Sequence, residues 1–236
     1  MILKKHIPNL LTCGNLFCGC IGIVATFQDN LVLAAYLTGI AGVLDFFDGF
    51  VARWLKAYSS IGKELDSLAD CVTFGVLPGM ILFHLIGKSM SNGSLPEGSS
   101  WLPFVAFVIS IFSALRLAKF NVDTRQTTSF IGVPTPANAL LISSFPLILW
   151  QYPPAETLIL NTYFLVGLTL LMSYLLVAEI PLFALKFTSY AFSKNRPKYI
   201  FLFLSLVLLF TLQFIAIPFI IALYILISLF NRNDVS

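Results

Sequence analysis

The chain has 236 residues, of which 58% are hydrophobic and only 11% are charged. Soluble domains carry roughly 25% charged residues, so this composition excludes an ordinary soluble domain and indicates a membrane protein. The formal net charge of +3 is small, and we expect no nucleic-acid partner.

Apolar runs separated by polar breaks predict an all-α, polytopic helical bundle with about eight transmembrane helices. The chain would form one integral membrane domain, residues 1–236. We interpret the first apolar run as a retained span, because it continues to Phe27 and no small-x-small cleavage site follows it. In chain order, helices are expected at residues 8–27, 31–56, 64–87, 101–120, 134–150, 158–184, 199–213 and 217–230, with a tight turn near Gln213 and Pro218 in the C-terminal hairpin of about residues 199–230.

The basic residues are distributed unevenly between the two ends of these helices. Of the 14 lysines and arginines, Lys88 alone falls on the side opposite the N-terminus. Positive loops face the cytoplasm in most membrane proteins, so this bias predicts a cytoplasmic N-terminus.

The stretch LDFFDGFVAR, residues 44–53, places two acids inside an apolar helix. Asp45 and Asp48 are three residues apart, and Asp66 and Asp70 in the next helix are four apart. Each spacing puts its pair on one helix face. The connector between the helices is short, so the two pairs are expected to converge near the inner membrane interface.

Four unpaired carboxylates at that depth would repel one another and would be costly to desolvate. Divalent cations remove this problem, and ligands that are all oxygen favour Mg²⁺, Mn²⁺ or Ca²⁺. Two such ions would clamp a phosphate or diphosphate. Gly49 lets a ligand approach the backbone, Ala52 is small, and Arg53 suits phosphate oxygens.

Two other interpretations remain at this point. The carboxylates could be interfacial groups that form salt bridges with Arg53, Lys56 and Lys63. The chain could also be a divalent-cation transporter whose acidic pairs bind the transported ion, although such residues would be expected nearer the middle of the membrane.

The pattern D-x-x-D-G-x-x-A-R, eight residues, then G-x-x-x-D-x-x-x-D spans residues 45–70. It resembles the signature of the CDP-alcohol phosphotransferases, integral membrane enzymes that are commonly homodimers. They transfer the phospho-substituent of a CDP-linked donor to an alcohol and release CMP. The resemblance implies that Asp70 is the general base and that Gly49, Ala52 and Arg53 lie along the nucleotide and its phosphates. It also implies two Mg²⁺ or Mn²⁺ ions, with Ca²⁺ as a bound substitute, held by Asp45, Asp48, Asp66 and Asp70.

Two further segments, residues 7–22 and 114–139, resemble the bacterial and archaeal phosphatidylserine synthases within this family. The resemblance covers most of a catalytic core at about residues 8–186. It implies transfer of a phosphatidyl group from CDP-diacylglycerol to L-serine among the lipids of a bacterial or archaeal cytoplasmic membrane, with the active site facing the cytoplasm. The alternative is the same reaction with glycerol phosphate, inositol phosphate or choline as acceptor.

Several polar residues in these segments have two interpretations. Arg116 and Lys119 could bind the donor diphosphate or the acceptor, or anchor the helix at a positive membrane face, and Asn121 could donate or accept a hydrogen bond to the acceptor. Thr12 and Asn15 could contact the nucleotide or form helix–helix hydrogen bonds. Glu179 is expected to pair with a cation such as Lys186 rather than take part in chemistry.

Overall fold

The computed structural model describes residues 2–57, 59–91, 98–123, 129–183 and 195–230. Almost all of these residues are helical, which confirms an all-α polytopic membrane protein. The elements are α1 (Ile2–Phe27), α2 (Leu31–Trp54), α3 (Ser60–Asp70), the π-helical η1 (Cys71–Val76), α4 (Leu77–Ser91), the 3₁₀ helix η2 (Ser99–Ala106), α5 (Phe107–Val122), β1 (Ser129–Ile131), α6 (Thr135–Gln151), η3 (Pro153–Ala155), α7 (Glu156–Ile159), α8 (Thr162–Val177), β2 (Pro181–Phe183), α9 (Arg196–Leu212), η5 (Gln213–Ile215) and α10 (Ala216–Phe230).

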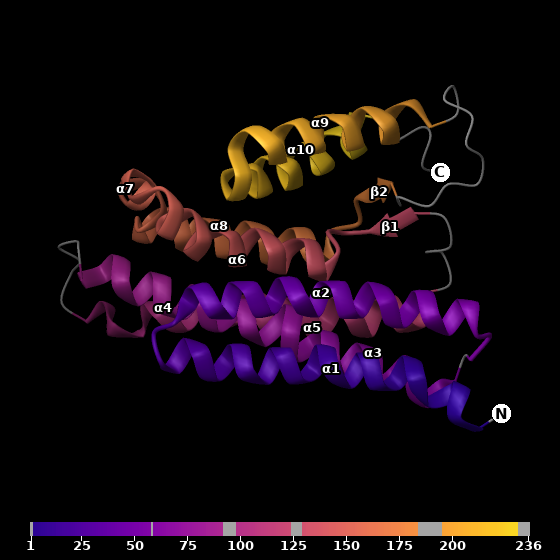
Figure 1. The fold of residues 1–236 in the computed structure, drawn as a ribbon. Coiled ribbons are helices and arrows are strands. Elements are labelled where there is room, and N and C mark those ends of the chain that lie inside the picture. The colour runs from indigo at the N-terminus through magenta and orange to yellow at the C-terminus, as the bar shows by residue number, and fades with distance from the viewer. Residues whose placement is uncertain (1, 58, 92–97, 124–128, 184–194, 231–236) are drawn as a thin grey trace.

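The long helices lie roughly along one axis (Figure 1). One end of the bundle, here called the N-terminal end, holds the beginning of α1, the beginning of α3 and the strands β1 and β2, while α7 lies at the other end (Figure 1). In the described residues, five helical segments are long and apolar enough to cross a membrane, or six if the bent pair α7–α8 counts as one span. The helix α6, with 17 residues, is shorter than all of those segments. The number of eight spans therefore stays a prediction.

The continuous segment α3–η1–α4 forms the centre of the bundle. Leu82, Leu85 and Ile86 of α4 are fully buried, and they belong to one core cluster with Ile109 of α5 and Ile142 of α6. Small residues bring the neighbouring helices close. A Cβ atom at Gly75 would lie only 3.1 Å from Cβ of Ser113 on α5, and Ser110 Oγ donates a 2.9 Å hydrogen bond to Gly75 O. Such contacts are how membrane helices associate.

Several helix ends differ from the sequence prediction; the first helix, for example, begins at Ile2 rather than at residue 8. Two of the differences have a clear local cause. The third helix begins at Ser60 rather than at residue 64, because Ser59 caps it by accepting a 3.0 Å hydrogen bond from the backbone N–H of Gly62. The sixth, expected over 158–184, instead bends by 69° between α7 and α8 and ends at Val177. Its prediction beyond Val177 was wrong, since Ala178 is extended and Pro181 begins a strand.

The two short strands form an antiparallel pair that the sequence analysis did not predict. Ser129 pairs with Phe183, and Ile131 pairs with Pro181. Beside the pair, Gly132 adopts a φ of +75°, a conformation that favours glycine. A Cβ atom at Gly132 would also collide with the backbone carbonyl of Leu176. The pair therefore fastens the segment before α6 to the end of α8.

The helices α9 and α10 lie side by side, and α10 also packs against α6 and β2 (Figure 1). The chain reverses at η5, where Gln213 has a positive φ of 51°. Gln213 therefore lies at the expected turn, whereas Pro218 belongs to the first turn of α10, a position that tolerates proline.

Candidate active site

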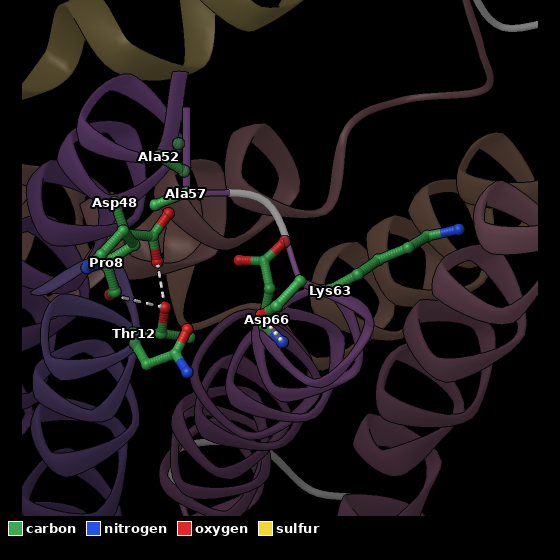
Figure 2. A pocket seen from close by; sticks show the side chains of 11 residues that line it. Pro8, Thr12, Asp48, Ala52, Ala57, Lys63 and Asp66 are labelled. Carbon is green, nitrogen blue, oxygen red and sulfur yellow. Dashed lines mark hydrogen bonds between the residues drawn. The ribbon is translucent and has the colours of Figure 1, made fainter. Parts of the chain in front are cut away.

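A cavity of about 200 Å³ opens at the N-terminal end of the bundle, between α1, α2 and α3. Figure 2 shows Thr12 and Asp48 joined by a hydrogen bond on one side of it and the carboxylate of Asp66 on the α3 side, while the side chain of Lys63 points away. Its lining residues are Pro8, Asn9, Thr12, Asp48, Gly49, Ala52, Ala57, Ser59, Gly62, Lys63 and Asp66.

Three of the four predicted aspartates converge beside this cavity. Asp45 and Asp48 come from α2 and Asp66 comes from α3, and each offers a carboxylate oxygen within 4.8 Å of the other two. Asp66 Oδ1 is buried and has no hydrogen-bond partner among the described residues. This donor set is all oxygen and is short of positive partners, so it fits a hard divalent cation.

The alternative of interfacial salt bridges finds no support in the described residues. Among the described residues, none of the four aspartates forms an ion pair with Arg53, Lys56, Lys63 or any other cation. The structure does show an ion pair near the opposite end of the bundle, where Lys88 Nζ lies 2.9 Å from Asp29 Oδ1.

The fourth aspartate, Asp70, lies outside the group of three. It is the last residue of α3 and is followed at once by the π-helical segment η1, a feature often found at functional sites. Asn15 Nδ2 donates a 3.0 Å hydrogen bond to Asp70 Oδ1, and both residues are buried.

The polar residues of α1 orient these carboxylates. Thr12 Oγ1 donates a 2.7 Å hydrogen bond to Asp48 Oδ2, and it also lies 3.1 Å from Pro8 O (Figure 2). Thr73 Oγ1 donates to Asn15 O at 3.2 Å. Both Thr12 and Asn15 therefore make helix–helix hydrogen bonds, one to α2 and one to α3, and Thr12 also lines the cavity.

Of the three residues expected along the nucleotide, two line the cavity and one does not. Gly49 and Ala52 line the cavity, and a Cβ atom at Gly49 would meet nothing within 4 Å. Open space at Gly49 leaves room for a ligand against the helix backbone. The side chain of Arg53 is exposed and is not part of the cavity lining.

The residues expected to bind the acceptor lie near the C-terminal end of α5. Arg116 is buried, and its Nη1 donates a 2.9 Å hydrogen bond to Thr135 Oγ1 at the start of α6. Lys119 is exposed. Asn121 instead links α5 to α3. Its side-chain Nδ2 donates a hydrogen bond to Ser67 Oγ at 2.8 Å, and its backbone carbonyl accepts one from Lys63 Nζ at 2.9 Å.

The sequence analysis did not single out three residues of these sites. Asn9 and Ser59 line the main cavity, and Thr135 holds Arg116. Ser59 carries a local signal, because serine is a favoured residue at the position just before a helix. Asn9 carries no such local signal, because its closeness to Gly62 on α3 depends on how α1 packs. A Cβ atom at Gly62 would lie 3.0 Å from Asn9 Oδ1. The expected partner of Glu179, Lys186, lies outside the described residues.

Comparison with known proteins finds several relatives of this chain. A 38% identical relative from Bacillus subtilis matches over 147 residues, which is 60% of this chain and 76% of the relative. A relative from Helicobacter pylori is 37% identical over 57% of this chain, and the match spans about half of that longer protein. A relative from Mycobacterium leprae is 27% identical over 94% of this chain and 71% of its own. All three are named CDP-diacylglycerol–serine O-phosphatidyltransferase.

The family model for CDP-alcohol phosphatidyltransferases matches residues 5–178, a stretch that contains the four aspartates, the cavity and Arg116. This chain therefore belongs to the CDP-alcohol phosphatidyltransferase family.

Proposed function

We propose that this protein transfers the phosphatidyl group of CDP-diacylglycerol to the hydroxyl of L-serine, giving phosphatidylserine and CMP. The observation that carries the family reaction is the convergence of Asp45, Asp48 and Asp66 beside a cavity at one end of a membrane bundle. The names of the relatives support serine as the acceptor.

The four aspartates are the proposed ligands of two divalent ions, Mg²⁺ or Mn²⁺, with Ca²⁺ as a bound substitute. Asp45, Asp48 and Asp66 present their oxygens together, and Asp70 lies one helical turn after Asp66 on α3. When bound, such ions neutralise the diphosphate charge and polarise its phosphorus. Thr12 and Asn15 hold two of the carboxylates in place, which is the usual task of residues that surround metal ligands.

The transfer itself exchanges one phosphorus–oxygen bond for another. The serine hydroxyl oxygen forms a bond to the phosphorus that carries the diacylglycerol. The bond from that phosphorus to the bridging oxygen breaks, and CMP leaves with the electron pair. Asp70 is the proposed general base that accepts the hydroxyl proton. The hydrogen bond from Asn15 fixes one oxygen of Asp70 and thereby orients the other.

The cavity at Gly49 and Ala52 is the proposed place of the nucleotide and its phosphates, and the exposed Arg53 could contact them from the rim. The acyl chains would stay among the membrane lipids beside α1 and α2. The loop charges favour an orientation with this end in the cytoplasm, where serine would be taken up and CMP released. The resemblance of residues 7–22 and 114–139 supports a bacterial or archaeal cytoplasmic membrane. Homodimer formation remains a proposal taken from the family.

An acceptor panel tests the proposal. The full chain, purified in detergent and mixed with CDP-diacylglycerol and Mn²⁺, is offered serine, glycerol phosphate, inositol phosphate or choline, and lipid product and CMP are measured by mass spectrometry. Phosphatidylserine with equimolar CMP supports the assignment. Product from another alcohol but none from serine would reassign the acceptor. Metal flux into vesicles without any CMP release would favour the transporter interpretation instead.

A further inference from the structure

A second cavity, of about 390 Å³, lies at the end of the bundle opposite the aspartates. It opens between the connection from α1 to α2, the last turns of α4 and α6, and the short helix α7, which lie together at that end (Figure 1). Its volume is within the range of small-molecule sites and is nearly twice that of the cavity beside Asp48. The proposed reaction makes no use of this cavity.

Three charged side chains line this second cavity. Lys88 Nζ lies 2.9 Å from Asp29 Oδ1, and the two side chains are 45% and 61% exposed. Glu156, the first residue of α7, is exposed as well. Because an exposed ion pair contributes little to stability, Lys88 can turn its donors toward another anion at little cost. The wall of the cavity therefore carries one cation that can bind a ligand and two anions.

Lys88 is an exception to the charge distribution of the chain. Of the 14 lysines and arginines, it alone is expected on this side of the membrane. The usual bias of membrane proteins disfavours lysine there, so a specific interaction explains this residue better than topology does. Its partner Asp29 has a positive φ of 57°, which is uncommon outside glycine, in the turn between α1 and α2. That turn holds the carboxylate of Asp29 beside Lys88.

The rest of the wall is mostly apolar and belongs to helices of the membrane bundle. Leu85 of α4 is fully buried, and Leu149 of α6 packs against the same core cluster. Trp150, the next residue of α6, also lines the cavity and is 63% exposed. Tryptophan is enriched where membrane proteins pass from the hydrocarbon to the headgroups. A ligand at this depth would have its polar part among lipid headgroups and its apolar part beside the two leucines.

We propose that this cavity binds the headgroup of a phospholipid with a primary ammonium group, the phosphatidylethanolamine class. Lys88 binds the phosphate, Asp29 and Glu156 bind the ammonium group, and the leucines contact the upper part of the acyl chains. The inference goes beyond the proposed reaction and does not depend on it.

The charges of the cavity distinguish this headgroup from the other common ones. A primary ammonium group donates hydrogen bonds to carboxylates, whereas the trimethylammonium group of a choline headgroup has no N–H to donate. A serine headgroup adds a carboxylate that Asp29 and Glu156 would repel, and a glycerol headgroup has no cation for them. The ethanolamine headgroup therefore complements this wall best.

Competitive lipid binding tests the proposal. The full chain is purified in detergent, depleted of lipid and mixed with equal amounts of phosphatidylethanolamine, phosphatidylcholine, phosphatidylserine and phosphatidylglycerol that carry the same acyl chains. Native mass spectrometry measures which lipid stays bound. Lys88→Gln and Glu156→Gln each remove one charge from the cavity, and Val32→Trp adds bulk to its wall without changing a charge. The matched controls, Lys56→Gln and Glu64→Gln, remove the same charges from exposed residues at the aspartate end.

Wild type should retain phosphatidylethanolamine about fivefold better than each of the other lipids, which is the upper range for an exposed ion pair. Lys88→Gln and Glu156→Gln should remove most of this preference, and Val32→Trp should reduce the amount of phosphatidylethanolamine that stays bound. Both controls should keep the wild-type preference. The three cavity variants should elute as wild type from a sizing column and keep wild-type CMP release, because their cavity lies at the other end of the bundle.

Equal retention of all the lipids by wild type would overturn the proposal, and so would an unchanged preference in both Lys88→Gln and Glu156→Gln. Free phosphoethanolamine, the same headgroup without acyl chains, is added as a competitor. It should not displace the lipid at equal concentration, because it lacks the apolar contacts. Displacement at equal concentration would show that the ligand is a soluble zwitterion, and the lipid site would be wrong.

Discussion

The hydrogen bond from Thr12 to Asp48 offers a sharp test of how the carboxylates are oriented. Thr12→Val removes the hydroxyl and keeps the shape of the side chain. The donor–acceptor distance is 2.7 Å, and Thr12 and Asp48 are only 3% and 6% exposed. A hydrogen bond to a charged group contributes about 1.5–3 kcal/mol, and each 1.36 kcal/mol corresponds to a factor of ten.

We therefore expect Thr12→Val to weaken metal activation by roughly 10- to 100-fold, which is also the usual effect of losing a residue that orients a metal ligand. The assay measures CMP release against Mn²⁺ concentration. The half-activating concentration should rise, and much of kcat should return at saturating Mn²⁺.

The matched control is Thr38→Val on α2. Thr38 is fully buried, donates to Ala34 O at 3.0 Å and accepts a hydrogen bond from Ser143 Oγ, but it is remote from the carboxylates. It should cost stability without changing the metal dependence. An unchanged Mn²⁺ curve in Thr12→Val, or an equal shift in Thr38→Val, would refute the reasoning.

Three further outcomes are expected. Asp70→Asn should reduce CMP release by roughly 10²–10⁴-fold in a protein that elutes as wild type from a sizing column. Asp29→Asn, in the ion pair with Lys88 near the opposite end of the bundle, should keep its activity. Substantial turnover in Asp70→Asn would remove Asp70 as the base. Gly132→Ala should lower Tm by roughly 2–10 °C, because the φ of +75° and the Leu176 carbonyl both oppose a Cβ atom there. Gly167→Ala, whose added Cβ atom would meet nothing within 4 Å, should not lower Tm. Equal Tm values for the two variants would contradict the strain argument. Chelation with EDTA should abolish turnover and added Mg²⁺ or Mn²⁺ should restore it, so activity in metal-free buffer would count against the carboxylate site.

The acidic pairs could be predicted because their geometry is local. The three-residue spacing of Asp45 and Asp48 fixes their common face, and the short connector to α3 forces Asp66 back toward them. Asp70 is the exception within the set. Its spacing from Asp66 suggested a shared site, but the π-helical segment after it and the hydrogen bond from Asn15 on α1 set its final position.

The parts that could not be predicted depend on contacts distant in sequence. The strands β1 and β2 have only three residues each, too few for a periodic signal, and their pairing joins segments about 50 residues apart. Asn121 looked available for a ligand, yet Ser67 on α3 occupies its side chain. The two roles of Thr12 and Asn15 could be separated only once the packing of α1 against α2 and α3 was known.

The most direct test of the central claim is a Mn²⁺ anomalous difference map from crystals of the full chain grown in lipid. The account predicts strong peaks within about 2.5 Å of the carboxylate oxygens of Asp45, Asp48 and Asp66, which disappear in Asp48→Asn. Peaks that lie elsewhere on the protein, or none near these three residues at saturating Mn²⁺, would contradict it.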